Sequence, residues 1–142
     1  MLGYWQRQDE TDKTIKDGWL HTGDLAVMRP DGNVTIVGRL SEMFKSGGYN
    51  VYPREIELCL EDHPAVQMAA VVAVADQVFD EVGHAFIVTS DETGVEDLRA
   101  HCIGRLARYK VPKAFHLLEE LPMLAVGKID KKALRAEALD PA

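Results

Sequence analysis

Three short polar clusters contain the residues that could do chemistry in this 142-residue chain. Asp24 places a carboxylate behind a glycine and just before a β-favouring run. Gly47 and Gly48 would allow the backbone to approach a ligand closely, and Lys128 places an ammonium group in a loop before an expected helix. Taken singly, each cluster also fits a structural role, as a turn-capping aspartate, a surface turn or a solvated lysine.

None of the common self-contained active-site motifs occurs in the sequence. It has no HExxH, no GxSxG and no GxGxxG after an expected strand. Gly127 and Lys128 match the end of a phosphate-binding P-loop, but that motif requires another glycine five positions before Gly127, where Pro122 stands. A functional interpretation must therefore rest on the order and spacing of the three clusters.

The charge balance excludes nucleic acid as a general partner. Sixteen basic and 23 acidic side chains give a net charge of −7, the wrong sign for neutralising phosphates along DNA or RNA. The longest apolar run, Met68–Ala75, has eight residues, well short of the roughly 18 needed to span a bilayer. The first ten residues lack a basic, apolar secretory leader, so we expect a cytoplasmic protein without a membrane span.

The length and the cysteine content predict a core that needs no covalent or metal support. A chain of this size removes roughly 68–70% of its unfolded surface from water on folding. Cys59 and Cys102 have neither CxxC spacing nor an adjoining histidine pair, so no metal site is expected. Both cysteines are predicted to be small core residues.

The three clusters are positioned by a predictable series of elements. Two β-favouring runs, 25–28 and 34–37, flank a turn sequence and predict a hairpin directly after Asp24. Residues 1–24 show no sustained periodicity, and their large apolar side chains have no evident partner strand. After residue 50 helices and strands alternate, which predicts an α+β fold with a short mixed sheet flanked by helices. The expected elements are a helix at 53–62, strands at 66–75, 85–89 and 114–118, and helices at 93–109 and from about 130.

Two details of these helices are specific expectations. Thr93 and Glu96 have the spacing of a capping box that would open the helix at 93–109, and Asp130 is placed to cap the last helix. In the helix at 53–62, Ile56 and Leu60 form the apolar face, while Glu57 falls on the polar face.

Read together, the clusters resemble the AMP-forming acyl-CoA synthetases of the adenylate-forming superfamily. The motifs that carry the resemblance are GWLHTGD at 18–24, GRLSEMFKSGGYNVYPREIE at 38–57 and LPMLAVGKIDKKAL at 121–134. The match runs from Met1 to about Arg135. It implies a ligase that first joins a carboxylic acid, of the fatty or aromatic class, to AMP from ATP and Mg²⁺. The CoA thiol then displaces AMP, and a small C-terminal domain rotates between the two steps.

The resemblance also implies roles for individual residues. Asp24 matches the aspartate that accepts hydrogen bonds from the ribose hydroxyls, and Arg39 matches an arginine near the ribose and phosphates. Lys128 matches the mobile lysine that reaches the α-phosphate and carboxylate during adenylation. Gly47, together with Gly48, matches the face that lines the pantetheine passage.

Two positions depart from the family pattern. Ser41 stands at the hinge, where the family usually has Asp or Lys, although a small residue can still absorb a backbone rotation. Residues 123–126 read Met-Leu-Ala-Val, where the family usually carries Arg-Thr-x-Ser/Thr. The loop before Lys128 therefore lacks hydroxyls that could contact phosphate or carboxylate.

The resemblance implies a division of the chain and a missing partner. Residues 1–38, including a hairpin at 25–38, match the end of a large N-terminal domain. Residues 39–41 match the hinge and 42–142 the C-terminal lid domain. The large domain of the family carries the phosphate loop, the adenine site and the acyl pocket. We therefore expect the isolated chain to be inactive and to self-associate through residues 1–38.

An alternative interpretation is a non-catalytic module. A stand-alone domain derived from this fold could dock on another synthetase or bind CoA, and a basic run could attract the CoA phosphates. The same cations could instead be a solvated helix end that complements the helix dipole. The run consists of Arg105, Arg108, Lys110 and Lys113.

Overall fold

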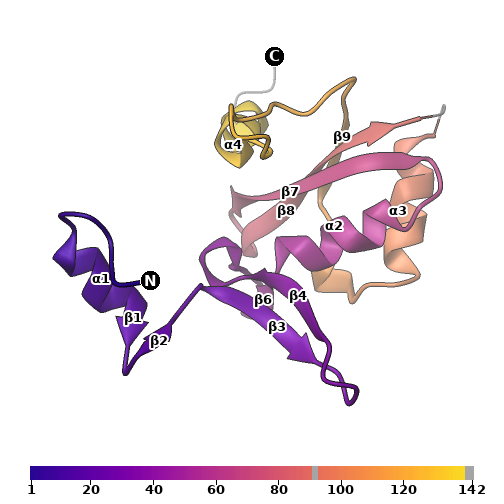
Figure 1. Ribbon diagram of the computed structural model, residues 1–142. Coiled ribbons are helices and arrows are strands. Elements are labelled where there is room, and N and C mark those ends of the chain that lie inside the picture. The colour runs from indigo at the N-terminus through magenta and orange to yellow at the C-terminus, as the bar shows by residue number, and fades with distance from the viewer. Residues whose placement is uncertain (91–92, 140–142) are drawn as a thin grey trace. The chain divides into compact units, whose positions relative to one another are not determined.

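The computed structural model describes residues 1–90 and 93–139 (Figure 1). The chain divides into two compact units, Met1–Ser41 and Glu42–Ala142.

The first unit contains a short helix and two small antiparallel hairpins. Its second hairpin confirms the predicted one, and its first and last residues, Asp24 and Arg39, are paired. Gly32 adopts a φ of +85° in the connecting turn, and the Asp31 carboxylate accepts hydrogen bonds from Asn33. The other elements lie in the region where no periodicity was found. The unit comprises α1 (Gln8–Thr14), β1 (Ile15–Lys16), β2 (Trp19–Leu20), β3 (Asp24–Met28) and β4 (Val34–Arg39).

The second unit is built on a mixed sheet, as predicted. Its strand order is β6-β5-β8-β7, and β9 pairs with β8. The β8–β9 pair is parallel and the other pairs are antiparallel. The strands are β5 (Phe44–Ser46), β6 (Tyr49–Val51), β7 (Val66–Asp76), β8 (Asp80–Thr89) and β9 (Ala114–Leu117).

Helices cover both faces of this sheet, and each face has its own apolar cluster. On one face Ile56 and Leu60 of α2 pack with Leu98 of α3 against Val71 of the sheet. On the other face Leu134 of α4 packs against Phe86 and its neighbours, and Figure 1 shows α4 across the sheet from α2 and α3. The helices are α2 (Pro53–Glu61), α3 (Val95–Ile103) and α4 (Lys131–Leu139), with 3₁₀ turns η1 (Leu40–Glu42) and η2 (Arg108–Lys110).

The structure corrects three local expectations. The N-cap of α3 is Gly94, without a side-chain cap, so the predicted capping box of Thr93 and Glu96 is wrong. The same helix ends at Ile103, with Gly104 as its C-cap, rather than near Tyr109. β8 begins at Asp80 instead of Ala85, since β7 and β8 form one long hairpin that stays paired to Asp76↔Asp80.

The end of that hairpin supplies a pH-sensitive contact. The Asp76 carboxylate accepts hydrogen bonds from Lys113 Nζ and from the backbone N–H groups of Val78 and Phe79. The bond from Lys113, followed by those from the backbone, lowers the pKa of Asp76 to about 2. Because this pKa is below its unfolded value of about 3.9, the ionised group stabilises the fold above about pH 4. That contribution is lost as the pH falls from about 4 through about 2.

The substitution Asp76→Asn tests this contact. Urea unfolding of the parent chain should show stability falling between about pH 4 and pH 2, and the variant should show a shallower fall because it lacks that proton uptake. Parallel stability curves for the two chains over this range would contradict the assignment.

Candidate functional site

Asp24 and Arg39 form one ion pair across the β3–β4 hairpin. The Nε of Arg39 lies 2.8 Å from Oδ1 of Asp24, and the arginine side chain is 56% exposed. Two hydrogen bonds fix the backbone beside this pair. The Leu40 N–H donates to the Gly23 carbonyl, and the Asp24 N–H donates to Thr22 Oγ1. A carboxylate only accepts hydrogen bonds and a guanidinium only donates them. The pair can therefore contact both hydroxyl and phosphate groups of one ligand.

Gly47 and Gly48 form the two-residue turn between β5 and β6. Their φ values are +55° and +84°, and Ser46 pairs directly with Tyr49 across the turn, an arrangement that strongly favours glycine at both positions. A Cβ on Gly47 would lie 3.3 Å from Cδ1 of Phe79, whereas a Cβ on Gly48 would meet nothing within 4 Å. The turn thus offers bare backbone beside an aromatic ring.

We expect Gly48→Ala to destabilise the chain by about 1–2 kcal/mol, because an alanine is strained at this positive φ. Gly104→Ala is the matched control, since Gly104 has a φ of −71° and a Cβ there would make ordinary contacts. Chemical denaturation of both variants measures the difference. Equal free energies of unfolding would show that the turn relaxes without cost.

Lys128 lies on a closed loop between β9 and α4. The Leu124 N–H donates to the Lys128 carbonyl at 2.7 Å, and the Gly127 N–H donates back to the Leu124 carbonyl at 2.9 Å. Met123 and Ile129 form an isolated bridge at the base of the loop, where Gly127 takes a φ of +77°. The backbone of the loop is therefore well fixed, while the Lys128 side chain is exposed.

The predicted cap of the last helix is confirmed. Oδ1 of Asp130 accepts hydrogen bonds from the backbone N–H groups of Lys132 and Ala133 at 3.0 and 3.1 Å. The side chains in the loop before Lys128 are exposed, with Val126 at 76%. Helix α4 therefore begins at a defined point only three residues beyond Lys128.

The sequence-predicted residues fall into separate places. Asp24 and Arg39 belong to the first unit, whereas Gly47, Gly48 and Lys128 belong to two different loops of the second unit. Ser41, the expected hinge residue, lies within the 3₁₀ turn η1. The ion pair and the glycine turn are the groupings that the structure brings together.

The basic run is largely engaged by carboxylates. Lys110 Nζ donates to both oxygens of Glu55 at 2.6 and 2.8 Å, and Lys113 pairs with Asp76. Arg105 lies 3.7 Å from Asp62. Helix α3 ends at Ile103, before these cations, and Arg108 and Lys110 lie instead in the 3₁₀ turn η2. The carboxylate contacts lessen the charge available to CoA phosphates.

The two cysteines pack together in the second unit. Cys102 is fully buried and Cys59 packs beside it in the apolar cluster, which confirms the core prediction. Both thiols are free, and burial raises the pKa of Cys59 and raises that of Cys102 to about 12. Among the described residues, no three His, Cys, Asp or Glu side chains are grouped to hold a metal ion.

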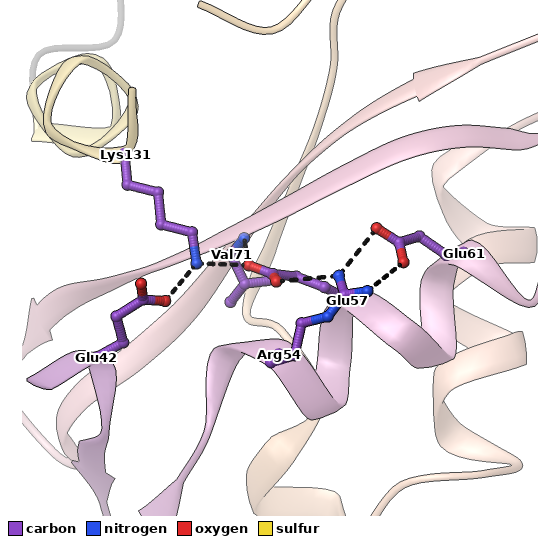
Figure 2. Close-up of polar contacts among 6 residues, drawn as sticks. All are labelled: Glu42, Arg54, Glu57, Glu61, Val71 and Lys131. Atoms are coloured by element: carbon purple, nitrogen blue, oxygen red, sulfur yellow. Dashed lines mark hydrogen bonds and ion pairs between the residues drawn. The ribbon is translucent and has the colours of Figure 1, made fainter. Parts of the chain in front are cut away.

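One polar cluster was missed by the sequence reasoning. Glu57 is 5% exposed although its helical position placed it on the polar face, and its carboxylate contacts Lys131 and Arg54 (Figure 2). A signal did exist, because Lys131 is a cation in the first turn of a helix, where the dipole disfavours positive charge. Its partners could not be identified from spacing, because Lys131 and Glu57 are far apart in the sequence.

The chain is similar in sequence to a known domain family and to several curated proteins. The model of the family described as AMP-binding enzyme C-terminal domain matches residues 55–128, just over half of the chain. The long-chain-fatty-acid–CoA ligase of Salmonella typhimurium is 49% identical over 139 residues, which cover 97% of this chain and 25% of that protein. The 2-succinylbenzoate–CoA ligase of Bacillus cereus is 44% identical over 94% of this chain and 28% of its own length. The chain thus spans about a quarter of the length of these relatives.

The chain is also similar in structure to solved enzymes. The o-succinylbenzoate CoA synthetase of Bacillus subtilis, in complex with its acyl-adenylate intermediate, has a TM-score of 0.84 and 35% identity over 99% of this chain and 28% of that protein. The amide bond synthetase of Marinactinospora thermotolerans has a TM-score of 0.87 and 34% identity over 94% of this chain and 28% of that protein. None of the helices in the described residues is long and apolar enough to cross a membrane.

Proposed function

Because this chain belongs to the AMP-binding enzyme C-terminal domain family, we propose that it acts as the C-terminal part of an ATP-dependent carboxylate–CoA ligase. In the first step a carboxylate oxygen attacks the α-phosphorus of ATP, and pyrophosphate leaves. In the second step the CoA sulfur attacks the acyl carbonyl, and AMP leaves with the bonding electrons. The partner that supplies the adenine site, the phosphate loop and the acyl pocket is a large N-terminal domain.

The closed loop that presents Lys128 is the observation that carries this proposal. Its backbone is fixed by reciprocal hydrogen bonds between Leu124, Gly127 and Lys128, while the side chain extends into solvent. A fixed backbone with a long charged side chain suits stabilisation of the charge that gathers on transferring phosphoryl oxygens. Lys128 is thus assigned to the adenylation step.

The other site residues are assigned to binding and movement. Asp24 accepts hydrogen bonds from the ribose hydroxyls, and Arg39, its ion-pair partner, contacts the adjoining phosphate region. Gly47 and Gly48 line the path of the CoA thiol, where bare backbone leaves room. Ser41 is the hinge about which the second unit rotates between the two steps.

The substrates follow from the same family. ATP and CoA are the co-substrates, and the acid belongs to the fatty or aromatic class that the names of the relatives indicate. Mg²⁺ enters with the ATP phosphates, because Mg²⁺ in such sites is held largely by phosphate oxygens and water. We place the protein in the cytoplasm, where ATP and CoA are supplied, and expect residues 1–38 to self-associate when no large domain covers Trp5 and Trp19.

A chimeric enzyme tests the proposed function. This chain would replace the matching C-terminal quarter of the Salmonella typhimurium ligase, and ATP–pyrophosphate exchange dependent on a fatty acid would be measured. We expect exchange and acyl-CoA formation to be restored relative to the large domain alone. A folded chimera that binds ATP but supports neither half-reaction would contradict the proposal.

The alternative of a stand-alone CoA-binding or docking module is not favoured. Curated relatives named as CoA ligases or acyl-CoA synthetases contain this region as part of a longer chain. The pairing of the basic run with Glu55, Asp62 and Asp76 points the same way. Calorimetry of the isolated chain with CoA should accordingly show no binding at micromolar concentrations.

A further inference from the structure

Lys131 joins two acidic residues that lie far from it in the sequence. Its Nζ is 2.6 Å from Oε2 of Glu42 and 2.7 Å from Oε1 of Glu57 (Figure 2). The Lys131 side chain is 27% exposed, so both contacts are partly shielded from water. Charge-assisted hydrogen bonds of this kind are shorter and stronger than those between neutral groups.

Glu57 provides a rigid base for this bridge. Its Oε1 accepts a hydrogen bond from the Val71 backbone N–H of β7 at 3.0 Å, and β7 lies at the edge of the sheet. Arg54 approaches the other oxygen of Glu57 at 3.5 Å and pairs with Glu61 at 3.0 Å. The Glu57 carboxylate is thus tied to a helix, a strand and Lys131 at once.

The bridge joins two parts of the second unit that are distant in the sequence. Glu42 directly follows Ser41 and is the first residue of the second unit. Lys131 is three residues after Lys128 and begins α4. The bridge therefore connects the start of the unit with the helix that follows the Lys128 loop, across 89 residues of sequence.

Helix stability does not explain a lysine at this position. The first turn of α4 contains two lysines and no acidic residue, although the positive end of the helix dipole favours acidic side chains there. The exposed Lys132 is equally placed in that turn but lies outside the bridge. Lys131 is accounted for by Glu42 and Glu57.

We propose that Lys131 is a positioning residue, which anchors the Lys128 loop to Glu42 so that the loop and the hinge-side end of the unit move as one body. This inference rests on the proposed function. When the backbone rotates at Ser41, the Glu42–Lys131 contact confines the rotation to the hinge and keeps it from extending beyond Glu42. The distance from the hinge to Lys128 is then preserved, and the ammonium reaches the same place in every catalytic cycle.

The anchoring is tested on the 142-residue chain by amide hydrogen exchange. In Lys131→Met we expect the amides of Leu124 and Gly127 to exchange about ten- to a hundredfold faster, because the charged hydrogen bonds that hold the start of α4, directly after the loop, are lost. Glu42→Gln leaves the Lys131–Glu57 pair in place and tests the hinge-side contact without exposing a buried charge. Lys132→Met is the matched control. Loop amides that exchange equally fast in Lys131→Met, Glu42→Gln and the control would overturn the anchoring.

The catalytic consequence is tested in the chimeric enzyme. We expect Lys131→Met to lower kcat of adenylation on the order of tenfold, as displacement of a catalytic group does, with KM for ATP unchanged and with Lys131→Arg recovering most of the rate. The double variant Glu42→Gln/Lys131→Met should be no slower than Lys131→Met, because the contact that Glu42→Gln weakens is already absent in Lys131→Met. Additive losses would overturn the proposal.

A parallel Lys128→Ala variant separates this inference from the proposed function. If Lys128→Ala slows adenylation while Lys131→Met equals Lys132→Met, the positioning role is wrong and the proposed function stands. If Lys128→Ala has no effect, the adenylation role of Lys128 is wrong, and the catalytic role of Lys131 falls with it. If the parent chimera itself supports neither half-reaction, the proposed function fails.

Discussion

Replacement of Lys128 by alanine in the assembled ligase should slow acyl-adenylate formation by about 10²–10³, or roughly 3–4 kcal/mol of barrier. The variant removes one preorganised positive charge from the place where negative charge gathers on the phosphoryl group. The Lys128 side chain is exposed and sits on a loop closed by its own backbone. The fold should therefore survive the change, so the loss is read as catalysis.

The neighbouring Lys132 gives the control for this experiment. It is also exposed and only four residues away, so Lys132→Ala removes the same charge from the same region. Rapid-quench measurement of acyl-AMP should show Lys132→Ala within about threefold of the parent, as expected for a surface charge that contributes little. If the two variants slow the reaction equally, the effect comes from the general positive charge of this region and not from a specific role of Lys128.

Leu134→Ala is expected to destabilise the second unit by about 2–5 kcal/mol, the usual cost of truncating a buried leucine. Leu134 is 0% exposed and is the buried residue of α4. It packs against the cluster that contains Phe86 and Leu121, and so holds the helix that follows the Lys128 loop. Without this contact, α4 should detach from the sheet before the rest of the second unit unfolds.

The same helix supplies the control for that prediction. Leu139→Ala makes the identical chemical change at a side chain that is 64% exposed, and surface changes of this kind stay within about 0.5 kcal/mol. Urea denaturation of both variants, followed by circular dichroism, measures the difference. If both leucines cost the same, α4 is not held to the sheet by Leu134.

Much of the fold could be predicted because local patterns and tertiary packing agree. The β-branched run of β7 is buried at Ala69–Val74, as its continuous apolar character indicated. Pro53 opens α2, and Asp130 caps α4. In each case the local preference of the backbone and the demand of the core select the same conformation.

The predictions from sequence were wrong where tertiary contacts determine the local structure. Glu57 is polar by type but buried, because Lys131 and the Val71 N–H satisfy its carboxylate from distant parts of the chain. Asp80 lies in a strand despite its charge, since the β7–β8 hairpin continues to its end. Thr93 does not cap α3, because Gly94 takes the N-cap position. Short-range patterns do not contain these contacts.

The candidate site shows the same division. The pairing of Asp24 with Arg39 follows from hairpin register, and the positive φ values of Gly47 and Gly48 follow from a two-residue turn, so both were within reach of the sequence. The roles of Asp24, Arg39 and Lys128 came from the family resemblance and remain predictions. The closed backbone of the Lys128 loop and its anchor at Lys131 needed the structure.

Comparison of the two half-reactions in Lys128→Ala gives the most direct test of the assigned chemistry. Adenylation would be followed from acid and ATP, and thioester formation from synthetic acyl-AMP and CoA, with the same enzyme preparation. We predict that adenylation falls by about 10²–10³ while thioester formation stays within a few-fold of the parent. Equal losses in the two half-reactions would contradict an adenylation role for Lys128.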